Sequence, residues 1–152
     1  MNIDRICMGC MRALVEGESQ CRYCGYRNGD ATGEQNIHHL KPYTILAGKY
    51  LVGKVLGEGG FGITYIGMDL NLEMKVAIKE FYPNGYVTRE GSVTNMVTEY
   101  AGNGQQAVMK WKEGFIREAR ILAKCSNLSG IVGVNDFFTE NNTAYIIMEY
   151  VE

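Results

Sequence analysis

The chain has 152 residues, of which 46% are hydrophobic and 21% charged, as expected for one globular domain with a small added module. The formal net charge of -2 gives no general basic field, which argues against nucleic acid and against a membrane surface as partners. No apolar run approaches the ~20 residues that span a bilayer, and the N-terminus lacks the apolar core of a secretion signal. We therefore expect a cytoplasmic location, where thiols stay reduced.

Three zones follow one another along the sequence. Residues 1–26 hold four of the five cysteines. Residues 27–43 are mostly polar and show no periodicity, which is typical of a linker, and the linker is expected to dock from Ile37 onwards. Residues 44–152 alternate apolar segments with turns, as a folded domain does.

The first zone carries two C-x-x-C pairs that are separated by ten residues, namely Cys7 with Cys10 and Cys21 with Cys24. Zinc prefers four such soft ligands in a tetrahedron, and each pair offers two thiolates from one tight turn. So small a module cannot bury a core, so it should depend on metal to fold. Two disulfides or incidental thiols are the alternatives, and no βαβ unit is visible that would support a redox motif. The pattern predicts a zinc ribbon.

Three further residues could bind metal but are interpreted as ordinary ones. Four cysteines already saturate a zinc ion, so His38 and His39 are expected to be surface or linker residues. Cys125 follows a predicted helix and is expected to be a small buried residue.

The third zone predicts an α+β fold. Residues rich in β-formers predict five strands, over 50–56, 63–68, 74–81, 131–138 and 143–150, with a hairpin loop at 139–142. One helix lies between the third and fourth strands, and its apolar residues recur at steps of three and four: Val108, Trp111, Phe115, Ala119 and Leu122. Gly114 weakens this helix by ~1 kcal/mol and marks a candidate break into two helices. Short connections favour an antiparallel sheet with the helix packed on it.

The sequence Gly57-Glu58-Gly59-Gly60-Phe61-Gly62 fits the pattern G-x-G-x-x-G, which alone is a weak signal. A dinucleotide-binding loop would lead into a helix, but the residues after Gly62 favour a strand. A Walker A loop would end in Gly-Lys-Ser/Thr, which is absent here. Glycines between two antiparallel strands leave backbone N–H groups free to approach phosphates. A plain glycine hairpin is the alternative.

Lys79 ends the apolar strand run Val76-Ala77-Ile78-Lys79 and would be costly to bury without an anion. Glu118 falls on the edge of the helix stripe that faces the sheet, whereas Glu113 falls on the opposite face. A carboxylate at this edge can reach a strand lysine and hold it toward a phosphate.

Taken together, these motifs resemble the small lobe of a protein kinase. The segments 57–64 and 76–79, Glu118, and Ile147-Met148-Glu149-Tyr150-Val151 follow one another in the order of that lobe. The amino-acid sequences of the first two segments are similar to those of bacterial serine/threonine kinases of the eukaryotic-like type. The resemblance covers residues 44–152. The resemblance implies a five-stranded antiparallel sheet with one helix, preceded here by the four-cysteine ribbon.

The resemblance also implies roles for individual residues. ATP is the implied cofactor, with Mg²⁺ in the intact kinase, and the glycine loop (residues 57–62) covers its phosphates. Lys79 contacts the α- and β-phosphates, and Glu118 orients it. Leu56, Thr64 and Ala77 would cover the adenine ring, and Met148 would be the gatekeeper. The backbone groups of Glu149 and Val151 would bind adenine at the hinge. Leu122 and Val134 match two positions of the internal hydrophobic spine.

The chain departs from the family pattern in three ways. Thr64 stands where many kinases have valine, and 38 residues separate Lys79 from Glu118, so residues 80–112 hold an insertion or an extra helix. The chain ends at Glu152 with no His-Arg-Asp loop, Asp-Phe-Gly site or activation segment, and it should not transfer phosphate alone.

Three hypotheses about function remain open at this point. The chain is part of a kinase that phosphorylates a protein substrate, with a large lobe or a dimer partner covering its exposed face. Alternatively, it is a non-catalytic nucleotide-sensing or protein-interaction module. In the third reading the ribbon is the functional part, although the acidic balance argues against nucleic acid.

Overall fold

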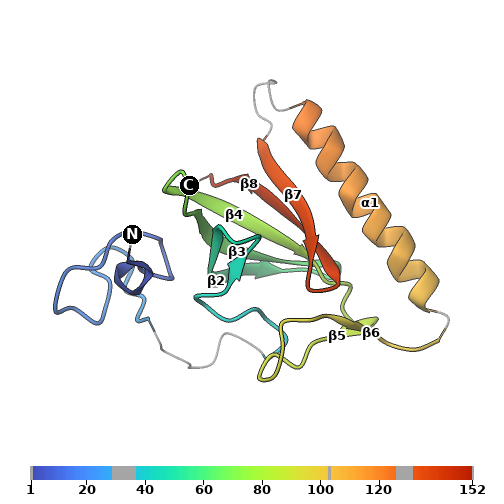
Figure 1. Cartoon of the computed structure of the whole chain (residues 1–152), viewed down its shortest axis with the longest axis horizontal. Helices are drawn as coiled ribbons and strands as arrows, with labels where there is room; N and C mark the ends of the chain where they lie inside the picture. The colour runs from blue at the N-terminus through green and yellow to red at the C-terminus, as the bar shows by residue number, and fades with distance from the viewer. Residues whose placement is uncertain (1, 29–36, 103, 126–131, 152) are drawn as a thin grey trace.

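The structure is a computed structural model that describes residues 2–28, 37–102, 104–125 and 132–151. In the view of Figure 1, a cysteine module, defined as residues 2–28, lies to the left of a twisted sheet, and a long helix lies to its right. The module begins with a short 3₁₀ helix, η1 (Ile3–Arg5). None of the described helices is both long and apolar enough to cross a membrane.

The main sheet is antiparallel, and its strand order is β1-β2-β3-β4-β8-β7. Its strands are β1 (Ile45–Leu46), β2 (Tyr50–Glu58), β3 (Gly62–Asp69), β4 (Met74–Phe81), β7 (Val134–Glu140) and β8 (Thr143–Glu149). The predicted arrangement, an antiparallel sheet with one long helix, is thus present.

The strands differ from the prediction in number and, by more than one residue at both ends, in the bounds of β7. The described part of the sheet has six strands instead of five, because Ile45 and Leu46 pair with the start of β2. β7 begins later and ends later than expected, and Ile131 lies outside the described residues. It runs to Glu140 because Asn141 and Asn142, with φ values of 56° and 58°, make the turn to β8 as a two-residue loop.

The helix α1 (Gly104–Lys124) is continuous, so the predicted break at Gly114 is wrong. An interior glycine costs about 1 kcal/mol, and the packing of the apolar stripe on both sides of it outweighs that loss. Val108, Phe115 and Ala119 are buried from this stripe. Trp111 is half-buried against the same core.

The described residues between β4 and α1 form no extra helix. They contain a second, two-stranded sheet made of β5 (Val87–Thr88) and β6 (Thr98–Glu99). The insertion therefore folds as strands and turns, and α1 starts four residues before the predicted stripe.

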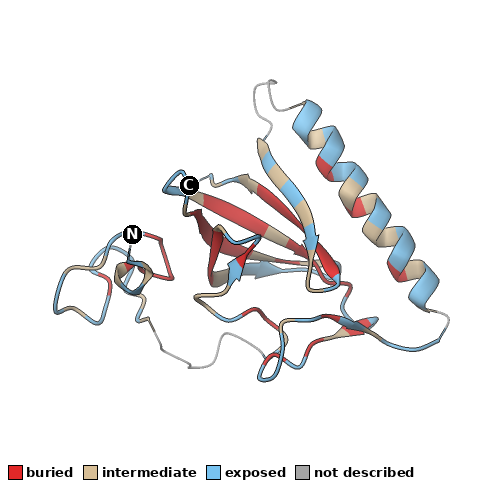
Figure 2. Cartoon of the chain, viewed as in Figure 1, coloured by how far each residue is buried: buried red, intermediate tan, exposed pale blue. Residues whose placement is uncertain are grey.

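The described residues form two main apolar cores, and Figure 2 shows buried residues concentrated in β4 and β8, with only a few buried positions on α1. The larger core is shared by the sheet, the insertion and α1. The smaller core joins the cysteine module to the sheet and consists of buried Ile6, Met8, Met11, Leu51, Ile66 and Met68.

Candidate nucleotide site and cysteine centre

The glycine loop is a hairpin between two strands. β2 ends at Glu58 and β3 begins at Gly62, and the Gly59 N–H donates to the Gly62 carbonyl at 2.9 Å. No helix follows the loop, which excludes the arrangement of a dinucleotide-binding fold.

The tip of the loop is held against its surroundings. The carbonyls of Phe61 and Gly60 accept hydrogen bonds from the backbone N–H groups of Tyr82 and Asn84, at 2.9 and 3.0 Å. The exposed Phe61 ring meets Trp111 of α1 edge-on, with ring centroids 5.1 Å apart. The glycine loop thus contacts both the start of the insertion, through hydrogen bonds, and helix α1, through the Phe61 ring.

A cavity of about 710 Å³ opens beneath this loop, between the loop, β4 and α1. Lys79 and Glu118 both line it, together with Thr64 of β3. Among the described residues the two charged groups form no ion pair, and the Lys79 Nζ instead lies 5.9 Å from the centroid of the Phe115 ring. The described lining of the cavity thus holds two lysines, Lys79 and Lys110, and two glutamates, Glu58 and Glu118, and Lys79 is not paired with Glu118.

Of the three predicted adenine residues, Thr64 lines this cavity, whereas Leu56 and Ala77 lie outside its lining, and Thr64 and Ala77 share a face of the sheet with Lys79. Thr64 is the register partner of Lys79, and Ala77 pairs with both Ile66 and Met148. Directly paired residues of antiparallel strands project to the same face.

Exposure of the remaining predicted positions is uneven. Leu56 and Val151 are exposed, and Glu149 at the end of β8 is also exposed. Leu122 and Val134 are both half-buried, and of these two residues only Val134 packs against the larger core.

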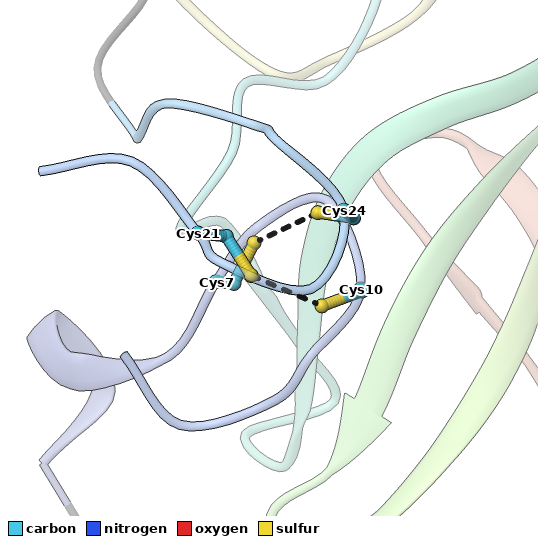
Figure 3. Close-up of side chains that lie close together, drawn as sticks. All are labelled: Cys7, Cys10, Cys21 and Cys24. Carbon is cyan, nitrogen blue, oxygen red and sulfur yellow. Dashed lines mark hydrogen bonds between the residues drawn. The ribbon is translucent and has the colours of Figure 1, made fainter. Parts of the chain in front are cut away.

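The four predicted zinc ligands point toward one another (Figure 3). The Sγ atoms of Cys7 and Cys24 are 3.5 Å apart, those of Cys10 and Cys21 are 3.7 Å apart, and all four lie within 4.8 Å of one another. Zn–S bonds of about 2.3 Å in a tetrahedron place sulfur atoms about 3.8 Å apart, which this cluster matches closely. Disulfide sulfurs would be about 2 Å apart, so the disulfide alternative does not fit.

Local backbone geometry builds each half of this cluster. The chain reverses at each C-x-x-C pair, with Met11 N–H donating to the Cys7 carbonyl and Gly25 N–H to the Cys21 carbonyl. The Gly9 N–H also donates to the Cys7 Sγ at 3.3 Å.

The thiols of the cluster differ in their acidity. Burial raises the pKa of Cys7 to about 12, while backbone hydrogen bonds from residues 24 and 23 outweigh burial at Cys21 and lower its pKa to about 7. A metal ion that binds all four sulfurs must therefore displace protons from the buried thiols.

The cysteine module packs directly on the sheet, which the sequence did not predict. Met8 and Met11 contact Ile66 in the smaller core, and the Met8 carbonyl accepts a hydrogen bond from Lys54 N–H at 2.8 Å. A Cβ at Gly53 would lie 2.5 Å from both the Met8 carbonyl oxygen and the Met11 Cε. The only local signal was a glycine in mid-strand, which marks a close approach of another segment.

Two side chains of the predicted linker also have defined partners. His38 and His39, predicted to be surface or linker residues, both contact Glu58, because their Nε2 atoms lie 2.7 and 2.8 Å from its two carboxylate oxygens. The His39 side chain is only 3% exposed. Cys125 is half-buried rather than buried, because it lies just beyond the end of α1.

Comparison with known proteins finds this chain similar to bacterial serine/threonine kinases. "Serine/threonine-protein kinase pkn2" of Myxococcus xanthus is 32% identical over 108 residues, which are 71% of this chain and 10% of that protein. "Serine/threonine-protein kinase PksC" of Streptomyces coelicolor is 31% identical over 112 residues, 71% of this chain and 16% of its own. "Serine/threonine-protein kinase F" of Synechocystis is 44% identical over 48 residues, 30% of this chain and 10% of that protein.

The resemblance to the N-terminal lobe of bacterial serine/threonine kinases is confirmed. A solved structure, "PpkA-294 apo form", superposes with a TM-score of 0.69 and 29% identity, covering 74% of this chain and 39% of the other. No family model matches the chain. The chain spans only 10–16% of the length of the curated kinases it matches.

Proposed function

We propose that this chain is the ATP-binding small lobe of a serine/threonine protein kinase, and that the intact enzyme transfers the γ-phosphate of ATP to protein serine or threonine. The observation that supports this most directly is the cavity beneath the glycine loop, which Lys79 and Glu118 both line. A lysine held there would neutralise phosphate oxygens, and the carboxylate would orient it once α1 moves closer.

Lys79 and Glu118 line the same cavity but are not paired with each other among the described residues. Phosphoryl transfer depends on positioning and on metal electrostatics, and the lysine–glutamate pair is one of the parts that must be in place. These 152 residues contain no recognisable Asp-Phe-Gly or His-Arg-Asp segment, so we propose that they bind nucleotide but do not transfer phosphate alone. In the intact protein, a large lobe or a second copy would cover the exposed Leu56 and Val151.

Nucleotide titration of the chain tests this proposal. We expect ATP to bind with a Kd of about 1 mM, worth about 4 kcal/mol, because a small lobe provides only half of the site. Lys79→Met should weaken binding at least tenfold, whereas Lys41→Met, which removes an exposed cation that does not line the cavity, should not. Equal binding by the Lys79→Met variant and the parent chain would contradict the proposed role of Lys79.

We further propose that Cys7, Cys10, Cys21 and Cys24 bind one structural Zn²⁺. The support is the sulfur geometry of the cluster: two sulfur pairs are 3.5 and 3.7 Å apart, close to the value for a tetrahedral ion, and all four sulfurs lie within 4.8 Å of one another. When bound, the zinc would hold the two turns of the cysteine module together.

Metal analysis after extensive dialysis against a weak chelator tests the zinc proposal. We expect about one tightly held Zn²⁺ per chain, since four thiolates form a closed structural site. Cys24→Ser should remove it, and Cys125→Ser, at the remaining cysteine, should leave it bound. Metal-free protein purified under reducing conditions would refute the assignment.

A further inference from the structure

We propose that His38, His39 and Glu58 form a second metal site, which takes a divalent transition-metal ion such as Zn²⁺ and ties the predicted linker to the glycine loop. The His38 Nε2 and His39 Nε2 atoms face the two oxygens of one carboxylate, and the ligand atoms all lie within 4.8 Å of one another. This cluster is separate from the four cysteines and shares no residue with them.

The donor set suits a borderline-soft ion. Two imidazole nitrogens and one carboxylate oxygen are three ligands that zinc accepts, with bonds of about 2.0–2.2 Å and one position left for water. Such bonds place neighbouring ligand atoms about 3.4 Å apart in a tetrahedron. The present separations of 2.7 and 2.8 Å need to open by about 0.6–0.7 Å, since the ion takes the place of two hydrogen bonds.

Binding requires a change of tautomer and no other reactant. Each Nε2 now shares a hydrogen with the carboxylate, and a metal ion takes the Nε2 lone pair. Each neutral ring would then carry its proton on Nδ1. The two neutral imidazoles and the ionised carboxylate together form a ligand set with a single net negative charge, which attracts the cation.

The backbone that carries both histidines is anchored in the core. The Arg89 guanidinium donates to the His38 carbonyl at 2.8 Å, and the Leu40 N–H donates to the Tyr65 hydroxyl at 3.0 Å. Leu40 is fully buried. The positive charge of Arg89 is neutralised by the buried Glu80, so it does not oppose a cation nearby.

This anchoring preorganises the two rings on one side of the site. The carboxylate comes from the other side, at the end of β2, where Glu58 begins the turn of the glycine loop. Because its side chain is 25% exposed, it can shift outward to admit an ion. A bound ion would fix the base of the loop to the segment before the sheet, and the insertion would support that segment through Arg89.

The test is a Zn²⁺ titration by calorimetry on the untagged full chain, whose cysteine centre has first been loaded and whose loosely bound metal has been removed. We expect one further equivalent to bind the parent chain. His38→Gln and Glu58→Gln should each weaken this second step at least tenfold, since each removes a ligand. Glu113→Gln, at an exposed glutamate of α1, is the matched control and should bind as the parent does.

Co²⁺ provides a second readout that separates the two centres. Bound at the second site, it should absorb in the visible range without the thiolate-to-cobalt charge-transfer band that the cysteine centre gives. Because His39 is buried and its replacement can prevent folding, the ligand variants tested are at the exposed partners, with folding checked by circular dichroism. No second equivalent in the parent chain, or an unchanged second step in folded His38→Gln, would overturn the proposal. Neither measurement uses nucleotide, so their outcome is independent of the proposed kinase role.

Discussion

Glu80, next to Lys79 on β4, is fully buried and accepts hydrogen bonds from three other buried side chains. Arg89 binds both of its oxygens, while the hydroxyls of Tyr65 and Tyr145 donate to them at 2.8 and 2.6 Å. Both side chains of the ion pair are 0% exposed. The glutamate therefore joins β3, β4, β8 and the insertion at a single carboxylate.

Glu80→Gln keeps the shape of this side chain and removes its charge. The Arg89 guanidinium cannot lose its proton, so it stays charged and buried without a counter-ion. Breaking a buried pair in this way costs about 3–5 kcal/mol, a large share of the ~5–15 kcal/mol that stabilises a typical domain. At about 2–4 °C per kcal/mol for a chain of this size, the Tm should fall by roughly 6–20 °C.

Urea unfolding of the zinc-loaded chain at neutral pH measures the loss. The double variant Glu80→Gln with Arg89→Met should recover part of it, because it removes the unpaired charge. Glu113→Gln on α1 serves as the exposed control and should change the free energy of unfolding by less than about 0.5 kcal/mol. If Glu80→Gln lowers the free energy of unfolding by less than about 1 kcal/mol, the Glu80–Arg89 ion pair does not stabilise the fold as proposed.

Three further changes probe the contacts around the lobe. Gly53→Ala should destabilise the chain by about 1–3 kcal/mol, because the added methyl group would push the cysteine module off the sheet. Urea unfolding would detect this loss, and an unchanged midpoint of the unfolding transition would argue against the close contact. Trp111→Ala should speed hydrogen exchange in the glycine loop several-fold, because each aromatic pair contributes about 0.5–1.5 kcal/mol; unchanged exchange would mean that Phe61 does not hold the loop. Strong chelation of the cysteine metal should lower the Tm measurably, and identical melting of the metal-free chain would exclude a structural ion.

Local sequence patterns predicted most of the strands and the helix. Alternating and β-branched runs placed β2, β3, β4 and β8 within two residues of their ends, and the apolar stripe placed α1. The failure at Gly114 has a plain cause, since helix propensity is a weak term beside the burial of Phe115 and Ala119.

The contacts that were missed all join segments far apart in the chain. His39 and Glu58 are separated by 19 positions, and Glu80 meets Tyr145 across 65. Such pairs depend on how the sheet twists and on which face each strand presents, which periodicity does not encode. A single histidine in a polar segment gives no sign that its partner lies in the glycine loop.

The register of β3 adds one consequence for the cysteine module. Thr64, Ile66 and Met68 alternate along β3 and so face the same side of the sheet, which is also the side of Lys79 and Ala77. The module covers Ile66 and Met68, while Thr64 lines the cavity two residues away. An ordered cysteine module fixes the position of the sheet at Ile66. We therefore expect metal binding by the four cysteines to affect the shape of the sheet face that carries Thr64 and Ala77, and the shape of that face to affect metal binding.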